Sequence, residues 1–194
     1  GRRPECISAG SGQHGAVFAS EAGVCVLTSS GLDGKGSWKV KRKGPSGAWE
    51  EGGSLRSAAE EPPFLPNVEL LEVGRARKFH AAVVRPRDFR PGRRYPALVS
   101  VYGGPLSQMV TASRRSYLLQ QWFADCGFVV VSLDGRGTPN RGREWERAIR
   151  GNVIERPLED QGEGLQAVCE RVPEIDPGRV GIFGWSFGGY FSAM

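Results

Sequence analysis

"GRVGIFGWSFGGYFSAM", residues 178–194, is the stretch that decides the fold of this chain. An apolar run leads into residues 184–188, and a segment that can begin a helix follows them. The spacing Gly-x-Ser-x-Gly in this context is typical of a sharp strand-to-helix turn that exposes a serine at the carboxyl edge of a sheet. We therefore predict that Ser186 is a nucleophile; the alternative is an ordinary turn rich in glycine and serine.

The residues around Ser186 suit this role. A tight turn crowds its neighbours, so small residues are needed two positions before and two positions after the serine, where Gly184 and Gly188 stand. The helix that begins at the turn points backbone N–H groups toward the place where an oxyanion would form.

A serine nucleophile also needs a histidine base with an acid behind it. Only six residues follow Gly188, and both histidines, His14 and His80, precede Ser186. This architecture orders its triad as Ser, then Asp or Glu, then His. We therefore expect both histidines to be structural or surface residues, which leaves Ser186 without a base in these 194 residues.

Composition excludes several classes of protein. Hydrophobic residues at 39% and charged residues at 24% are ordinary for a globular protein, and no apolar run approaches the roughly 20 residues of a membrane span. The net charge is +5, but the basic clusters at 38–43 and 85–94 lack the interleaved aromatics of a nucleic-acid platform. The four cysteines are far apart, which predicts buried free thiols and no zinc site.

The first part of the chain reads as short strands separated by turns. Strands are expected at 16–19, 24–28 and 38–43, and the Gly-, Ser-, Glu- and Pro-rich stretch 44–66 indicates a connector with at most a short helix. Three such strands cannot bury a core alone. We therefore expect a domain boundary near residue 65.

From residue 66 onward, strands alternate with helices, the pattern of a mostly parallel sheet covered on both faces. The first two strands look like an antiparallel pair at an edge, and the later ones are apolar enough to be buried on both sides. The expected strands lie at 68–73, 79–86, 95–104, 128–134 and 179–185, and the expected helices at 116–127 and 157–172.

Two loops after buried strands carry further candidates. In "VSVYGGP", residues 99–105, Tyr102 offers a phenol O–H and the glycines let the backbone approach a reacting carbon; the alternative is a Gly-Pro turn with a structural tyrosine. In "LDGRGTPNRGREWE", residues 133–146, we expect Asp134 and Arg136 to pair and order the loop; direct substrate contact is the alternative.

These blocks together resemble the prolyl oligopeptidase family of serine peptidases, and within it the dipeptidyl-peptidase IV branch. The resemblance is carried by "YPALVSVYGGP", "GFVVVSLDGRGTPNRG", "LEDQGEGLQAV" and "IDPGRVGIFGWSFGGYFSAM", and more loosely by "VFASEAGVCVLTSSGLD". Several independent blocks in one order make the match more specific than any single motif.

The resemblance implies an α/β fold, the N-terminal half of an α/β-hydrolase domain preceded by the last strands of a β-propeller. Residues 1–65 would be the end of the propeller plus a connector, and residues 66–194 the peptidase domain, truncated after the serine turn. Ser186 would be the nucleophile, and Tyr102 with the backbone N–H of Phe187 would form the oxyanion hole. No cofactor and no metal is implied.

The implied activity is that of a serine peptidase releasing N-terminal dipeptides, Xaa-Pro or Xaa-Ala, from peptide substrates through an acyl-enzyme. The alternatives are another acyl hydrolase of this fold, such as an acylaminoacyl-peptidase or an esterase, and a non-catalytic binding relative. A homodimer of the full-length protein is compatible with the resemblance. No nucleic-acid partner and no membrane segment is expected in this stretch of sequence.

The sequence departs from the family pattern in two respects. Phe187 stands where tyrosine is usual, which should matter little because the backbone N–H acts. The acidic motif that captures a peptide's amino terminus would lie upstream, and the catalytic Asp and His downstream with most of the side-chain pocket. We therefore expect the 194 residues alone to be nearly inactive and to aggregate through an exposed strand edge. Because the chain starts at Gly1, its cellular compartment stays open.

Overall fold

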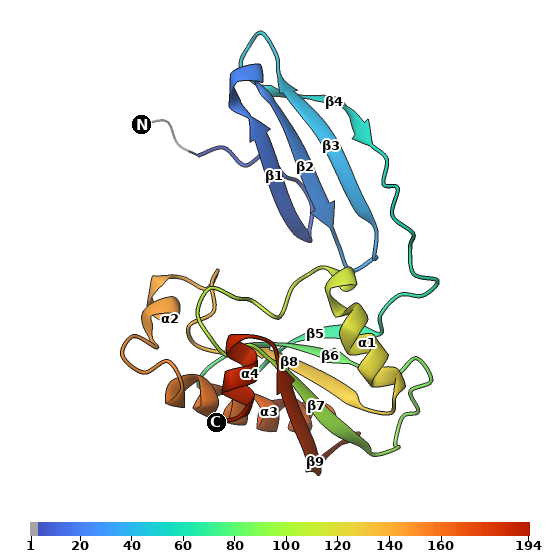
Figure 1. Ribbon diagram of the computed structural model, residues 1–194, viewed down its shortest axis with the longest axis vertical. Coiled ribbons are helices and arrows are strands. Elements are labelled where there is room, and N and C mark those ends of the chain that lie inside the picture. Colours follow the sequence, from blue (N-terminus) through green and yellow to red (C-terminus); the bar gives the residue numbers. More distant parts are fainter. Residues whose placement is uncertain (1–3) are drawn as a thin grey trace. The chain divides into compact units, whose positions relative to one another are not determined.

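The computed structural model describes residues 4–194, which divide into two compact units (Figure 1). One unit contains the chain up to Leu65 together with Ala112–Ser116, and the other contains Pro66–Thr111 and Tyr117–Met194. The main division thus falls where the sequence changes from turn-separated strands to alternating strands and helices.

The first unit is an antiparallel sheet of four strands in chain order. Its strands are β1 (Gln13–Ala19), β2 (Val24–Ser30), β3 (Gly36–Lys43) and β4 (Trp49–Leu55), and the 3-10 turn η1 (Ser20–Ala22) joins the first two. The three strands expected from the sequence lie within β1, β2 and β3 and are confirmed.

The fourth strand corrects the expectation of a connector over this part of the chain. β4 pairs with β3, and its first residue, Trp49, packs edge-on against Phe18 with ring centroids 5.7 Å apart. Lys39 of β3 forms an ion pair with Glu51 of β4 at 3.3 Å. Cross-strand contacts of this kind stabilise a glycine-containing strand that has little β-propensity of its own. The sequence pattern of residues 49–55 alone therefore could not reveal it.

The second unit is built on a five-stranded sheet with the order β5-β6-β8-β7-β9. The strands are β5 (Val68–Val73), β6 (Phe79–Val84), β7 (Tyr95–Val101), β8 (Val129–Asp134) and β9 (Ile175–Gly184). β5 and β6 are antiparallel at one edge, as expected, and β7 runs parallel to both of its neighbours. The predicted α/β fold class is confirmed.

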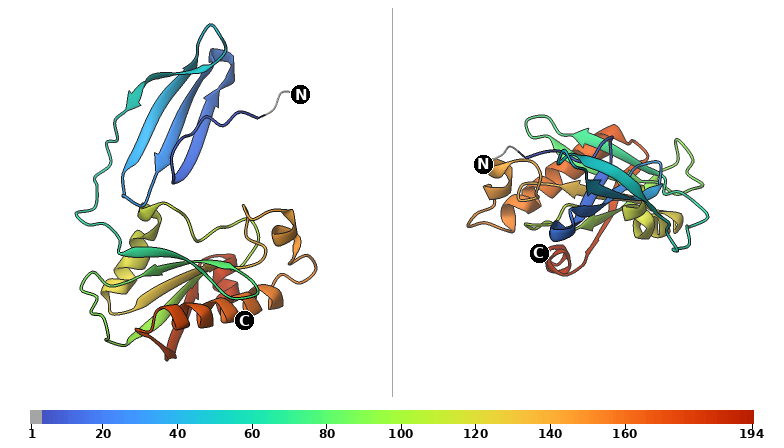
Figure 2. Two further views of the ribbon diagram at one scale, coloured as in Figure 1. Left: turned by 180° about the vertical axis from the view of Figure 1, so that it is seen from behind. Right: turned by 90° about the horizontal axis from the view of Figure 1, so that it is seen from above.

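Helices cover both faces of this sheet (Figures 1 and 2). They are η2 (Arg114–Tyr117), α1 (Leu118–Asp125), α2 (Arg143–Arg147), α3 (Glu155–Arg171) and α4 (Phe187–Ser192). The long helices α1 and α3 were expected, whereas α2 lies in a stretch that the sequence indicated only as a loop. Gly127, with φ of +101°, follows α1 as predicted, because glycine tolerates the left-handed conformation at a helix end.

Alternation along the strands sorts the side chains into two cores. Val131 faces α3, where Val168 is fully buried, while Val130 packs with Tyr117 and Ala124 on the α1 side. The apolar stripe predicted on α3 is confirmed, since its members all pack in the same core: Leu165, Val168, Cys169 and Val172. The sheet is therefore buried on both faces around β6, β8 and β7.

β9 lies at the edge of the sheet and is less covered. Val180 and Ile182 are 44% and 43% exposed, in line with the expected exposed strand edge. Asp176 accepts hydrogen bonds from the backbone of Gly178 and the side chain of Arg179, and the register with β7 shifts here. The Asp-Pro-Gly turn expected from the sequence is thus a bulge within this strand.

Two buried carboxylates attach loops to the second sheet. The side chain of Asp160 on α3 is 0% exposed and accepts hydrogen bonds from the backbone N–H and the guanidinium of Arg136 at 2.6 and 2.9 Å. Asp134 at the end of β8 accepts instead from the backbone N–H groups of Met109 and Val110. The predicted Asp134–Arg136 pair was therefore wrong.

The reason is that β8 ends at Asp134. The side chain of Asp134 still lies on the face of Val130, toward α1, whereas Arg136 stands two residues beyond the strand, where alternation no longer applies, and reaches Asp160 on α3. The two side chains leave the end of β8 in different directions, so each carboxylate finds its own partner.

Replacing Asp160 should destabilise the protein strongly. In Asp160→Ala the Arg136 guanidinium, only 16% exposed, keeps its burial but loses its buried carboxylate partner. Breaking such a buried pair typically costs about 3–5 kcal/mol in free energy of unfolding, measured by urea denaturation of the full-length protein. Glu159, which also pairs with Arg136 but is 62% exposed, is the matched control, and Glu159→Ala should cost under about 1 kcal/mol. Equal losses of stability in Asp160→Ala and Glu159→Ala would contradict the assignment of Asp160 as the stabilising partner of Arg136.

Stability should also depend on pH through Asp134. Burial raises the pKa of Asp134 from 3.8 to about 6, against the opposing effects of the Met109 and Val110 N–H groups and of Arg141. Because the folded-state pKa is the higher one, this group's contribution is fully present below the unfolded value and is lost as the pH rises through about 6.

Wild type should therefore lose stability relative to Asp134→Asn between about pH 4.5 and about pH 6.5 in urea denaturation, with little further change at higher pH. Asp125 is the control: burial raises its pKa, but hydrogen bonds from Arg87 and Gln121 outweigh this and lower it. Wild type and Asp125→Asn should differ by a constant amount over that range. A constant difference for Asp134→Asn as well would refute the prediction.

Candidate active site

Ser186 stands in a strained turn between β9 and α4. Its φ of +56° and ψ of −121° form a combination that residues with a side chain rarely adopt. The carbonyl of Ser186 accepts hydrogen bonds from the N–H groups of Gly189 and Tyr190, which tie the turn to the first turn of α4. Ser186 is exposed, so its hydroxyl faces outward from a fixed backbone. We call residues 184–188 the serine turn.

Close backbone packing explains the glycines of the serine turn. A Cβ atom on Gly184 would lie 2.3 Å from the carbonyl carbon and oxygen of Gly188. A Cβ atom on Gly188 would lie 2.2 Å from the carbonyl oxygen of Val101, the last residue of β7. These contacting atoms belong to the backbone and cannot swing away, so only glycine permits α4 to start this close to the end of β7.

The loop after β7 packs against the same helix. Gly103 has φ of +69°, and a Cβ atom there would lie 2.8 Å from the Phe191 ring. A Cβ atom on Gly104 would lie 2.5 Å from the ring of Phe187. We call residues 102–111 the Tyr102 loop. Its glycines allow its backbone to lie directly on the side chains of α4.

The structure brings Tyr102 and Phe187 together. Their rings are tilted with centroids 5.9 Å apart, and Tyr102 is half-buried. Phe187 is the first residue of α4, and N–H groups in the first turn of a helix have no partner within that helix. The ring of Tyr102 thus lies beside the side chain of the residue that directly follows Ser186.

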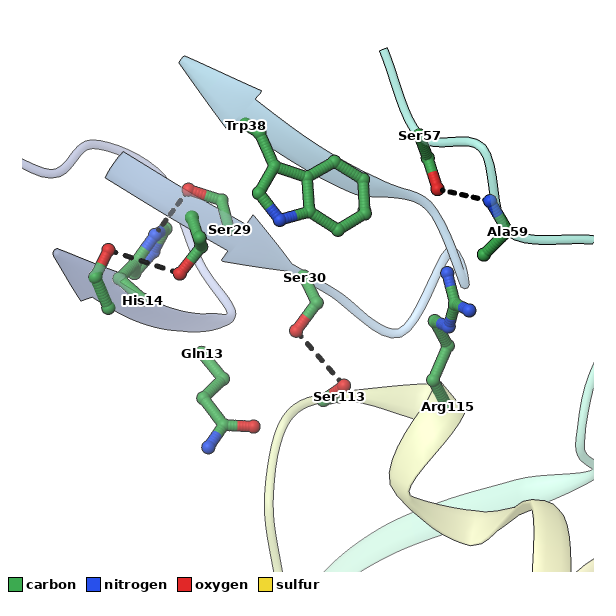
Figure 3. A pocket seen from close by; sticks show the side chains of 12 residues that line it. Gln13, His14, Ser29, Ser30, Trp38, Ser57, Ala59, Ser113 and Arg115 are labelled. Carbon is green, nitrogen blue, oxygen red and sulfur yellow. Dashed lines mark hydrogen bonds between the residues drawn. The ribbon is translucent and has the colours of Figure 1, made fainter. Parts of the chain in front are cut away.

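His14 lies in the first unit and has partners there (Figure 3). Its Nδ1 is 2.8 Å from the hydroxyl oxygen of Ser29, and its Nε2 is 3.3 Å from the carbonyl oxygen of Gly10. It lines a polar pocket of about 400 Å³ that also contains Trp38 and Arg115. These contacts agree with the structural role expected for this histidine.

His80 lies on β6, directly opposite Asp134 of β8. Burial lowers its pKa, and the charge of Arg141 acts in the same direction while Glu72 opposes it. In the strand order β6-β8-β7-β9, three strand spacings of about 4.8 Å, or about 14 Å, separate it from β9, which ends at Gly184, two residues before Ser186. Within residues 4–194, neither histidine is hydrogen-bonded to Ser186.

The serine turn, the Tyr102 loop and α4 each carry a large exposed side chain. Trp185 is 89% exposed, Tyr190 is 55% exposed, and Leu106 is 92% exposed with φ of +69°. The sequence analysis did not single out Leu106. Its only signal is its place directly after the Gly-Gly-Pro turn, which does not predict a left-handed leucine.

The described residues lack both a metal-binding cluster and a membrane-spanning helix. Residues 4–194 contain no group of three or more histidine, cysteine, aspartate or glutamate side chains arranged to hold a metal ion. The same part of the chain has no helix that is long and apolar enough to cross a membrane.

Known proteins similar to this chain include dipeptidyl peptidases. The chain is 36% identical over 143 residues to dipeptidyl peptidase 8 of Homo sapiens, covering 72% of this chain and 16% of that protein. It is 32% identical over 191 residues to a dipeptidyl-aminopeptidase B of Botryotinia fuckeliana, covering 93% of this chain and 20% of that protein. The chain therefore spans about a fifth or less of the length of these curated relatives.

A solved structure and a family model agree with these relatives. The crystal structure of Porphyromonas gingivalis dipeptidyl peptidase 4 superimposes with a TM-score of 0.78 at 30% identity, covering 95% of this chain and 27% of that chain. Residues 114–194, which include the serine turn, match the model of the prolyl oligopeptidase family. Through these residues, the chain belongs to the prolyl oligopeptidase family, as its sequence motifs predicted.

Proposed function

We propose that the full-length protein is a serine peptidase that releases N-terminal dipeptides, Xaa-Pro or Xaa-Ala, from peptide substrates. The observation that carries the proposal is the strained, exposed Ser186 packed beside the Tyr102 loop. The names of the relatives, dipeptidyl peptidase and dipeptidyl-aminopeptidase, support the same class of substrate. In this proposal residues 1–65 are the end of a propeller plus a connector, and residues 66–194 are part of the peptidase domain.

In the proposed reaction, the Ser186 oxygen forms a bond to the carbonyl carbon of the second substrate residue and gives its proton to a histidine. The carbonyl oxygen becomes an oxyanion that accepts hydrogen bonds from the Tyr102 hydroxyl and the Phe187 N–H. The C–N bond then breaks, and the leaving amine takes the proton from the histidine. Water then attacks the carbonyl carbon of the acyl-enzyme and gives a proton to the histidine; the C–O bond to Ser186 breaks, the Ser186 oxygen takes that proton, and the dipeptide leaves as a carboxylic acid.

The proposal takes the histidine and its acid from parts of the full-length protein that follow residue 194. His80 is separated from Ser186 by about three strand spacings, and His14 has partners in its own sheet, so the proposal uses neither as the base for Ser186. The share of the relatives covered by this chain leaves ample sequence for both groups. By itself the chain should then show little of the triad's contribution to the rate.

Removal of the Ser186 hydroxyl tests the proposal. The full-length protein should hydrolyse a dipeptidyl-proline reporter in preference to short-chain esters and should be labelled at Ser186 by a fluorophosphonate. Ser186→Ala should abolish the labelling and lower kcat by about a million-fold, as loss of a triad nucleophile does. Ser192→Ala is the control, because the Ser192 hydroxyl donates to the Gly188 carbonyl within α4. A preference for esters would favour a different acyl hydrolase, and absence of labelling a non-catalytic relative.

The oxyanion role of Tyr102 is tested by removing one oxygen atom. Tyr102→Phe keeps the ring against Phe187 but removes the donor, and should lower kcat by about 100- to 1,000-fold with little change in KM. Tyr190 is the matched control, since its ring also lies beside Phe187, at 6.0 Å, and is 55% exposed. Tyr190→Phe should leave kcat almost unchanged. Similar losses in both variants would count against a specific role of the Tyr102 hydroxyl.

A further inference from the structure

We propose that Asp134 is a positioning residue for the Tyr102 loop: its carboxylate holds the far end of the loop and thereby sets where Tyr102 stands beside Ser186. The inference rests on the proposed function, because it concerns how the oxyanion donors are held. It assigns a purpose to a buried charge that the proposed chemistry itself does not use.

The contact is bidentate. Asp134 is the last residue of β8 and is 1% exposed. One carboxylate oxygen accepts the backbone N–H of Met109 at 2.8 Å, and the other accepts that of Val110 at 3.0 Å. Two bonds to successive N–H groups fix the direction as well as the position of the backbone, because each oxygen holds a different peptide unit.

A second anchor follows directly. The hydroxyl of Tyr117, a fully buried residue, accepts the N–H of Thr111 and donates to the carbonyl of Thr111, both at 2.8 Å. Residues 109–111 are therefore attached to the end of β8 and to the start of α1. This end of the Tyr102 loop cannot shift without breaking hydrogen bonds in the interior of the second unit.

The other end of the loop begins at Tyr102, directly after β7. Gly103 and Gly104 follow it and pack against the rings of α4. Between the two ends, Leu106 is exposed and strained, and Gln108 accepts a hydrogen bond from Asn140 at 2.9 Å. Because a glycine backbone can adopt many conformations, fixing the loop at residues 109–111 limits the path of Gly103 and Gly104, and with it the orientation of the Tyr102 side chain.

The electrostatic surroundings suit a permanent anchor. Burial raises the pKa of Asp134 to about 6, and the N–H groups of Met109 and Val110 with the charge of Arg141 oppose that rise. Near neutral pH the group is then ionised, and both oxygens accept. His80 faces it from β6, and burial lowers the pKa of that histidine, so the imidazole does not supply a competing cation.

The test compares two buried carboxylates in the full-length protein. Asp134→Ala removes both acceptors of the loop and should lower kcat by about 100-fold, the typical cost of misplacing a catalytic group by an ångström, with a much smaller change in KM. Asp134→Asn keeps one acceptor oxygen and should retain part of the rate. Asp160→Asn is the control, since Asp160 is equally buried but is bonded to Arg136. This change should lower the free energy of unfolding and leave kcat nearly unchanged.

A double-mutant cycle separates positioning from general loss of structure. If Asp134 acts through Tyr102, then Asp134→Ala should have little further effect once Tyr102→Phe has removed the donor. The Asp160→Asn change should have the same small effect in both backgrounds. Fully additive losses for Asp134→Ala and Tyr102→Phe would overturn the inference.

Two readouts do not depend on peptide hydrolysis. Hydrogen exchange at the amides of residues 104–110 should be at least about tenfold faster in Asp134→Ala than in Asp160→Asn. Fluorophosphonate labelling of Ser186 should also be slower in Asp134→Ala than in Asp160→Asn, because the phosphoryl oxygen of the reagent needs the same hydrogen-bond donors as the peptide oxyanion. If peptides are not cleaved but both results hold, the peptidase proposal fails and the anchor stands. Unchanged exchange or unchanged labelling would overturn it.

Discussion

The contact on which the candidate site depends is the approach of α4 to the end of β7. A Cβ atom at Gly188 would lie 2.2 Å from the Val101 carbonyl, and one at Gly184 would lie 2.3 Å from Gly188 itself. With glycine at both places, β9 can turn into α4 within two residues, and Ser186 is forced to a positive φ. The exposure of the serine and the first N–H groups of the helix both follow from this packing.

The parallel strands determine what else meets at this edge. β7, β8 and β9 end on the same side, so the Tyr102 loop, Asp134 and Ser186 lie along one edge of the sheet. Helix α4 closes the arrangement, because Phe187 and Phe191 pack on the glycines of the Tyr102 loop. The candidate donors are therefore held by backbone packing and by a buried carboxylate, and less by contacts between their own polar groups.

The sequence was most informative where a pattern has a strong local cause. Apolar runs such as that of β8 predicted buried strands, and the spacing of Val168 and its neighbours predicted the packed face of α3. It failed at β4, whose pairing depends on the charges and rings of β3 and β1, and at Asp134, for which it predicted Arg136 as the partner. In both cases the decisive partner is distant along the chain or on another face.

The α/β fold class, the serine turn and the family could be inferred from the sequence, because glycine spacing and apolar periodicity are local properties of the chain. Which groups meet at the serine turn depends on the tertiary structure. It set Phe187 beside Tyr102 and joined Asp134 to the Tyr102 loop. It also placed His80 three strand positions away from β9, the strand that leads to Ser186. The order of strands in a sheet sets these distances, and that order depends on packing across the whole unit.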